Sequence, residues 1–160
     1  MDIISHGAWG SLILGKKSNP WWAAAWGILP DAIAFIPYQT AQVFGGKLAA
    51  IAAAPQTYPP WVTTVYNSTH SLLIAGIVFY ILCHIRLDLG LSFLAWPLHI
   101  LFDIPTHTAA SFPTKFLFPL SHLHLDGVSW RNGYIFLANW LAIIIVFGFL
   151  TLKFQALHQE

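Results

Sequence analysis

The sequence has little charge, and this separates it from most water-soluble domains. Only 8% of its 160 residues are Asp, Glu, Lys or Arg, against roughly a quarter in an average soluble domain. In contrast, 57% are hydrophobic and 16% are aromatic. The net charge of +1 offers no basic surface for nucleic acid, so we expect no nucleic-acid partner. The composition indicates an integral membrane protein.

Cysteine and glutamate are almost absent. The single cysteine, Cys83, lies in an apolar run and excludes an internal disulfide. The only glutamate is Glu160, so the acidic groups within the chain are aspartates. No basic region precedes the first apolar run, and we therefore expect no cleaved signal peptide.

Long uncharged stretches are abundant. Leu48 to Ile85 carries no formal charge, and Tyr134 to Leu152 is an uncharged run of 19 residues, about 28 Å of helix. We predict an all-α fold, a single integral membrane domain over residues 1–160. It should contain four or five membrane-embedded helices and one interfacial helix.

Local signals predict the helices of the first half. Residues 3–14 form a short apolar helix that Gly15 can end, and Ser18-Asn19-Pro20 caps a helix from Trp21 to about Phe35. Residues 38–60 contain glutamines, glycines and prolines. We predict an interfacial amphipathic helix and a loop there.

In the second half, Asn67, Ser68 and Thr69 can cap a membrane helix over Ser71 to Ile85. His70 would then lie in its first turn. The chain turns near Arg86 to Gly90 before the next helix, and residues 108–133 are predicted to be a loop.

An imidazole and a carboxylate inside an apolar run carry the clearest chemical signal. His99 and Asp103 are four residues apart, which on a helix places them on one face. Such a pair is the usual beginning of a metal site, although a structural hydrogen bond gives the same pattern. His107 continues the spacing, but Pro105 disturbs the helix, so the direction of His107 is left open.

Three further polar residues fall near the depth of this pair. Asp31 lies in an apolar helix, where a carboxylate costs on the order of 3 kcal/mol without a partner, a metal or water. Counting residues from the two expected hairpin turns places His6 level with Asp31, and His70 level with Asp103. Residues that share one site must lie at a similar depth, as these do. A structural role remains the alternative for each residue.

Basic residues indicate which way such a site faces. The end opposite the polar groups should hold Lys16, Lys17, Arg86 and Lys153. Lys115 and Arg131 lie on the polar side. Basic residues favour the cytoplasm, so we expect the site to face outward, near the outer leaflet.

The order of these motifs resembles a known family. His6, then Pro30-Asp31, then Thr69-His70-Ser71, then His99-x-x-x-Asp103 is similar to the YdjM-type membrane-bound metal-dependent hydrolases, over residues 1 to about 110. These hydrolases are considered remote relatives of zinc-dependent phospholipase C and S1/P1 nuclease.

The resemblance implies a cluster of two zinc ions, or three. Asp31, His70 and His99 would hold one metal, and Asp31 could also orient or deprotonate the attacking water. Asp103 would bridge to a second metal that His6 also holds.

One part of the phospholipase pattern has no match here, because a later His-x-x-x-Glu helix is missing. His107 could supply a substitute ligand. The loop residues His122, His124 and Asp126 could do so as well, although a solvated loop explains them more simply.

Such a site supports hydrolysis, since metals activate water and polarise phosphoryl oxygens. Near lipid headgroups, the expected function is a multi-pass phosphoesterase of the bacterial inner membrane acting on a phospholipid or another lipid phosphate. A metal-ion or proton transporter, a haem-binding protein and a scaffold without chemistry are the alternatives. Haem ligation does not need Asp31 or Asp103, and a scaffold would tolerate alanine at every motif position.

Overall fold

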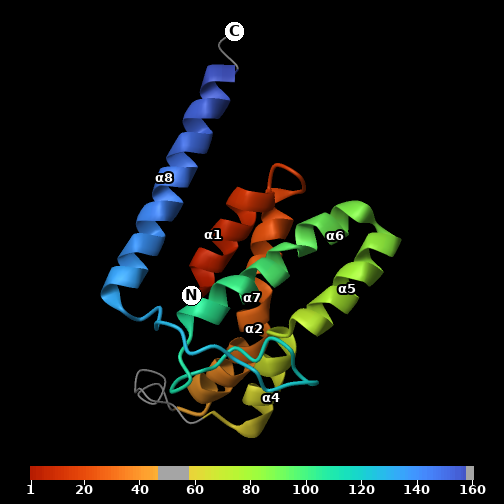
Figure 1. Ribbon diagram of the computed structural model, residues 1–160, viewed down its shortest axis with the longest axis vertical. Coiled ribbons are helices and arrows are strands. Elements are labelled where there is room, and N and C mark those ends of the chain that lie inside the picture. Colours follow the sequence, from red (N-terminus) through yellow and green to blue (C-terminus); the bar gives the residue numbers. More distant parts are fainter. Residues whose placement is uncertain (47–57, 158–160) are drawn as a thin grey trace.

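The computed structural model describes residues 1–46 and 58–157, and these residues fold entirely into helices and loops. The helices in chain order are α1 (Ile3–Leu14), α2 (Pro20–Phe44), α4 (Pro60–Thr69), α5 (Leu72–Ile85), α6 (Leu87–Phe93), α7 (Ala95–Thr106) and α8 (Gly133–Leu157). The helices α1, α2 and α7 pack together in the centre, α5 and α6 form a hairpin on one side, and α8 flanks the other side (Figure 1). The predicted all-α fold is confirmed for the described residues.

Helix α1 begins and ends, and helix α2 begins, where the sequence predicted. Asn19 caps α2, its side chain accepting hydrogen bonds from the first backbone amides of the helix. Glycines allow the two backbones to approach closely. A Cβ atom on Gly10 would lie 2.6 Å from the carbonyl oxygen of Ala23, and one on Gly27 would lie 2.5 Å from that of His6. Contact through Gly27 therefore places His6 directly against α2.

Helix α2 is longer than predicted. The sequence suggested an end near Phe35, but the helix continues through Pro37 to Phe44. Proline removes one backbone donor, and the rest of the helix can compensate when it is packed. The residues that we assigned to an interfacial segment from position 38 therefore begin as the last turns of α2. Residues 47–57 of that predicted segment lie outside the described residues.

The predicted position of His70 in a helical turn is wrong. Helix α4 ends at Thr69, and His70 lies in the bend between α4 and α5, whose axes differ by 54°. The hydroxyls of Ser68 and Thr69 bond back to carbonyls of α4, so they do not cap α5. Ser71 is the cap, accepting a hydrogen bond from the backbone of Ile74.

Among the residues that the structure describes, two helical stretches are long and apolar enough to cross a membrane, which indicates that the protein is membrane-associated. They are Leu87–Thr106, which joins α6 and α7, and Gly133–Ala156 in α8; the bent pair α4 and α5 adds a third if it counts as one span. This is fewer than the four or five membrane-embedded helices predicted. The 12 residues of α1 reach only about 18 Å, and the 14 residues of α5 about 21 Å.

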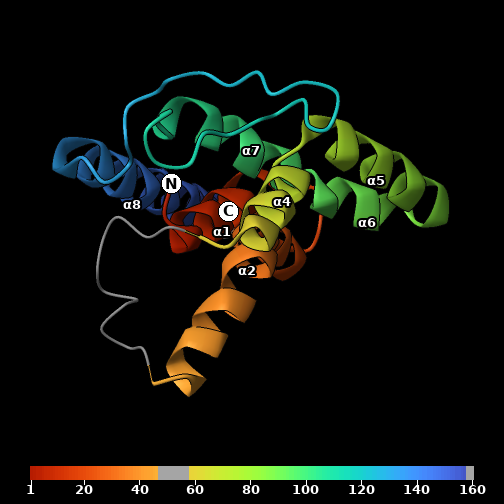
Figure 2. The ribbon, with the colours of Figure 1, turned by 90° about the horizontal axis from the view of Figure 1, so that it is seen from below.

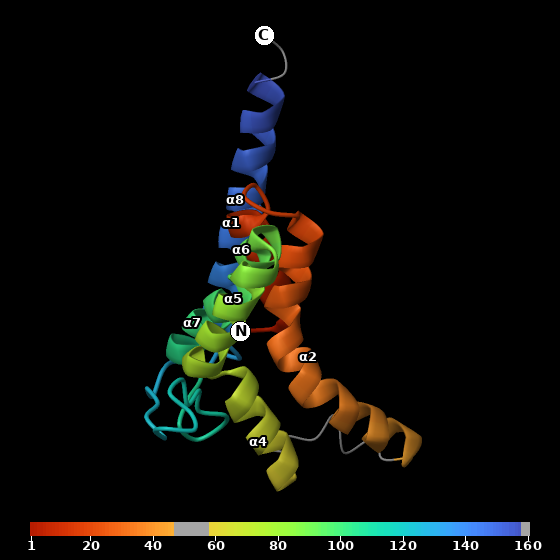
Figure 3. The same cartoon turned by 90° about the vertical axis from the view of Figure 1, so that its right-hand side faces the viewer.

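One end of the molecule is built from α4, the C-terminal half of α2 and the loop of residues 107–132 (Figure 3). The turn between α1 and α2 lies at the other end (Figure 1). The loop returns to α7, where Gly127 and Val128 donate hydrogen bonds to the carbonyls of His107 and Pro105. Seen from below, it runs over α7 toward the start of α5 and back (Figure 2). The prediction of a loop in this region is confirmed.

Candidate metal centre

Four side chains from three parts of the chain converge on one point: Asp31 of α2, His70 of the bend, and His99 and Asp103 of α7. One ligand atom from each lies within 4.8 Å of the others. The Nε2 atoms of His70 and His99 are 3.0 Å apart. Asp103 Oδ2 lies 3.1 Å from the Nε2 of His99, and Asp31 Oδ1 lies 3.4 Å from the Nε2 of His70. This group could hold a metal ion.

Burial differs among the four. The side chains of His70, His99 and Asp103 have no exposed surface, whereas that of Asp31 is 13% exposed. Asp31 therefore lies where the group meets open space.

Backbone carbonyls determine which nitrogen of each imidazole carries the proton. Nδ1 of His70 lies 3.0 Å from the carbonyl oxygen of Tyr66, and Nδ1 of His99 lies 2.7 Å from that of Gly27. A carbonyl oxygen can only accept, so each Nδ1 is protonated and donates. In its neutral form, each ring then presents the lone pair of Nε2 to the centre. Metal-binding histidines are commonly oriented in this way.

The centre consequently contains four acceptors facing one another. The two Nε2 lone pairs meet two carboxylate oxygens, and the buried Asp103 Oδ2 has no hydrogen-bond partner among the described residues. Acceptors this close repel one another unless a cation lies among them, either a metal ion or an additional proton on one imidazole. The group offers imidazole nitrogen and carboxylate oxygen, and zinc binds both of these ligand types in proteins. The residues therefore fit a divalent metal ion.

The other oxygen of Asp103 faces a second set of groups. His6 Nε2 lies 3.0 Å from Oδ1 and His107 Nδ1 lies 3.4 Å from it, and the amine of Met1 bonds to the same oxygen. The His6 ring stacks on that of His99, with their centroids 3.5 Å apart. Burial lowers the pKa of His107, which keeps its ring neutral at pH 7. Asp103 thus joins two sets of polar atoms.

The structure brings together all six residues that the sequence singled out as metal ligands: His6, Asp31, His70, His99, Asp103 and His107. The depth argument, which placed His6, Asp31, His70 and Asp103 near one end of the bundle, agrees with these distances. His107 joins them because α7 continues through Pro105 to Thr106. Their binding of a metal stays a prediction.

The predicted reserve ligands of the loop are elsewhere. His122 and Asp126 are exposed, and Asp126 accepts a hydrogen bond from the backbone of Ala109. His124 contacts the carbonyl of His122. None of the three joins the group around Asp103.

Several residues that support the centre had no motif to reveal them. The Tyr66 ring stacks on His70 with centroids 3.8 Å apart, and its hydroxyl hydrogen-bonds with that of Thr114. Gly27 acts through its carbonyl, which no side-chain pattern reports. The spacing of four residues between Tyr66 and His70 was the one available signal.

Compared with known proteins, the chain matches no protein-family model, no curated protein and no solved structure. The resemblance in motif order is therefore the only link to a family, and it stays a prediction.

Proposed function

We propose that the chain is a membrane-embedded, metal-dependent hydrolase that acts on a phosphoester lipid. The observation that carries the proposal is the convergence of four acceptors, including a fully buried carboxylate oxygen without a hydrogen-bond partner among the described residues. Such a group is most readily explained as a binding site for a divalent cation, and zinc suits its nitrogen and oxygen ligands.

The ligands divide into two groups around Asp103. Asp31, His70 and His99 would hold one cation together with Oδ2 of Asp103, while His6 lies at Oδ1 with His107 beside it. A carboxylate that presents one oxygen to each group supports a bridging role and two ions. His107 is the candidate for completing the second group.

A divalent cation in such a site lowers the pKa of water toward neutrality and polarises a phosphoryl oxygen. Asp31 is the residue of the group that reaches open space. Its Oδ1 faces the imidazoles, and its other oxygen has no hydrogen-bond partner among the described residues. That oxygen can orient a water molecule and accept its proton. The carbonyls behind His70 and His99 keep both rings fixed while this happens.

The distribution of charge supports a site on the outer face of the bacterial inner membrane. Lys16 and Lys17 lie in the turn at the end of α1, whereas the bonds of Asp103 to Met1 and His6 lie at its beginning. Basic residues favour the cytoplasmic side. A site near the outer headgroups would encounter lipid phosphoesters as its substrates.

The test is hydrolysis of phospholipids by the purified full chain in lipid nanodiscs supplied with zinc. We expect phosphate or phosphorylated headgroup to be released, and release to fall to background in Asp31→Asn and after chelation. The matched control Asp126→Asn should keep full activity, because that carboxylate lies on the exposed loop. Bound metal without hydrolysis of any phosphoester, together with metal flux across vesicles, would replace this proposal with a transporter.

A further inference from the structure

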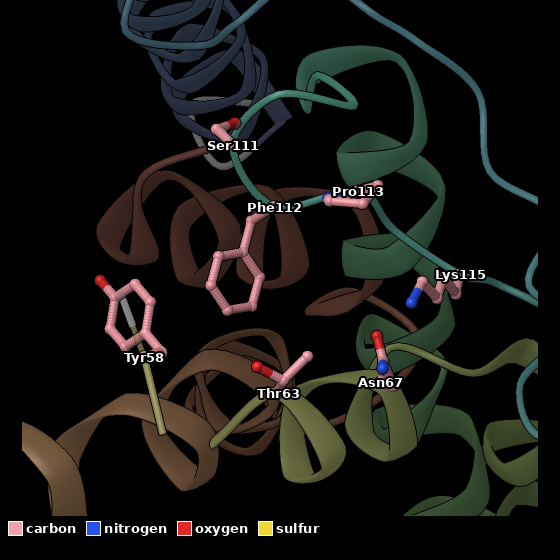
Figure 4. A pocket seen from close by; sticks show the side chains of 7 residues that line it. All are labelled: Tyr58, Thr63, Asn67, Ser111, Phe112, Pro113 and Lys115. Carbon is pink, nitrogen blue, oxygen red and sulfur yellow. The ribbon is translucent and has the colours of Figure 1, made fainter. Parts of the chain in front are cut away.

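A pocket of about 220 Å³ lies between α4 and residues 111–115 of the loop, at the end of the molecule that holds the metal centre. Thr63 and Asn67 of α4 line one side, and Ser111, Phe112 and Lys115 line the other, with Tyr58 at one end (Figure 4). The pocket lies outside the group of ligands around Asp103.

Asn67 is the first sign that this pocket holds a polar ligand. The residue is only 6% exposed, and no hydrogen bond joins its side chain to another described residue. Figure 4 shows the amide directed into the pocket, toward the loop. Because the amide reaches the space of the pocket and pairs with no described residue, it is available to a polar ligand bound there.

Lys115 indicates the charge of that ligand. Among the described residues it is the one charged side chain that lines the pocket, and it forms no salt bridge with any of them. Its ammonium group and the Asn67 amide face each other from opposite walls (Figure 4). Hydroxyl groups of Thr63 and Ser111 line the same space. An ammonium, an amide and hydroxyls together match the several acceptor oxygens of a phosphate group.

Aromatic rings connect the pocket to the metal centre. Phe112 lines the pocket, and its ring centroid lies 4.5 Å from that of Tyr66. The Tyr66 ring also stacks on that of His70, with centroids 3.8 Å apart. One layer of aromatic side chains therefore separates the pocket from a ligand of the proposed metal.

We propose that this pocket binds a phosphate group, that of a lipid headgroup, with Lys115 and Asn67 as its main contacts. Its role as a recognition subsite for the substrate rests on the proposed hydrolase function, whereas phosphate binding itself does not. The two can therefore fail separately.

The experiment measures binding by isothermal titration calorimetry to the full chain in detergent, after chelation so that the metal centre cannot hold phosphate. The probes are inorganic phosphate, a short-chain phosphatidic acid and a zwitterionic short-chain lipid. We expect phosphatidic acid to bind, and Lys115→Gln to weaken it by about tenfold or more, the usual effect of losing a charged hydrogen bond. The matched control Lys16→Gln removes the same charge at the opposite end and should leave the affinity unchanged.

Asn67→Asp provides a second variant, in which an added negative charge should also weaken phosphate binding. Equal affinity in Lys115→Gln and wild type would overturn the proposal, as would failure of both phosphate probes to bind. Binding of inorganic phosphate alone would keep the phosphate site and reject the lipid as its source. Zinc content, measured before chelation, should be the same in Lys115→Gln and wild type. A wild type that contains no zinc but still binds phosphate would contradict the proposed hydrolase and would support the phosphate-binding pocket.

Discussion

The chain carries two sets of histidines and aspartates, and only one of them forms a buried group. His122, His124 and Asp126 lie within five residues of one another, on a loop where two of them are exposed. The set around Asp103 is drawn from positions up to a hundred residues apart, and its side chains converge between packed helices. Closeness in sequence therefore does not predict which side chains form a buried group. Convergence of helices creates the group, and burial leaves its acceptors in need of a cation.

The largest difference between the two sets should be in stability. Asp103→Ala removes the carboxylate that faces His6, His70 and His99, and losing one partner of a buried charged group costs about 3–5 kcal/mol. Asp126→Ala removes an exposed carboxylate bonded to one backbone amide and should cost about 1 kcal/mol or less. Thermal unfolding in detergent compares them. Equal losses would show that the buried set carries no special interaction.

A smaller effect is expected from a glycine that brings α1 against α2. A Cβ atom on Gly27 would lie 2.5 Å from the carbonyl oxygen of His6, so Gly27→Ala should force the helices apart and cost about 1–3 kcal/mol. Gly76 is exposed on α5 and a Cβ there meets nothing within 4 Å, so Gly76→Ala should be neutral or stabilising by up to about 1 kcal/mol. The midpoint of thermal unfolding checks both. A tolerated Gly27→Ala would contradict the close approach of His6 to α2.

Within the buried set, replacing His107 should weaken metal binding less than replacing His99. It lies 3.4 Å from Asp103 Oδ1 and outside the four residues that converge most closely. We expect His107→Ala to weaken the binding of a second zinc ion by about tenfold and to leave the first ion bound. A tenfold loss of metal affinity is the smaller effect expected when a residue that supports a metal site is removed. Competition with a chelating dye measures both affinities. Loss of both ions would place His107 in the first group.

The smallest effect belongs to the loop histidines. A double variant, His122→Ala with His124→Ala, should change stability by no more than about 0.5 kcal/mol and leave the zinc content unchanged. A lower zinc content in the double variant than in the wild type would show that the loop supplies a ligand.

Patterns along the sequence predicted much of the fold, because caps and apolar runs act locally. The C-terminal end of α1 and the start of α2 follow from Gly15 and Asn19-Pro20. The continuation of α2 through Pro37 could not be read in this way. Packing of a helix can offset the cost of one proline, and packing is invisible to local signals.

The candidate site was predictable to the level of depth along the membrane. Residue counts placed His6, Asp31, His70 and Asp103 near one end, and the distances agree. The bend at His70 was not predictable, because Asn67, Ser68 and Thr69 are good caps whose side chains serve other purposes in the folded chain. The pocket beside Lys115 was missed as well, since its two walls meet only through the return of the loop.

Metal content tests the central claim most directly. Purified wild type, measured by elemental analysis beside a His99→Ala/Asp103→Ala double variant, should contain at least one divalent ion per chain, and the variant should contain almost none. A wild type with metal content near zero, equal to that of the variant even after supply of zinc, would contradict the account.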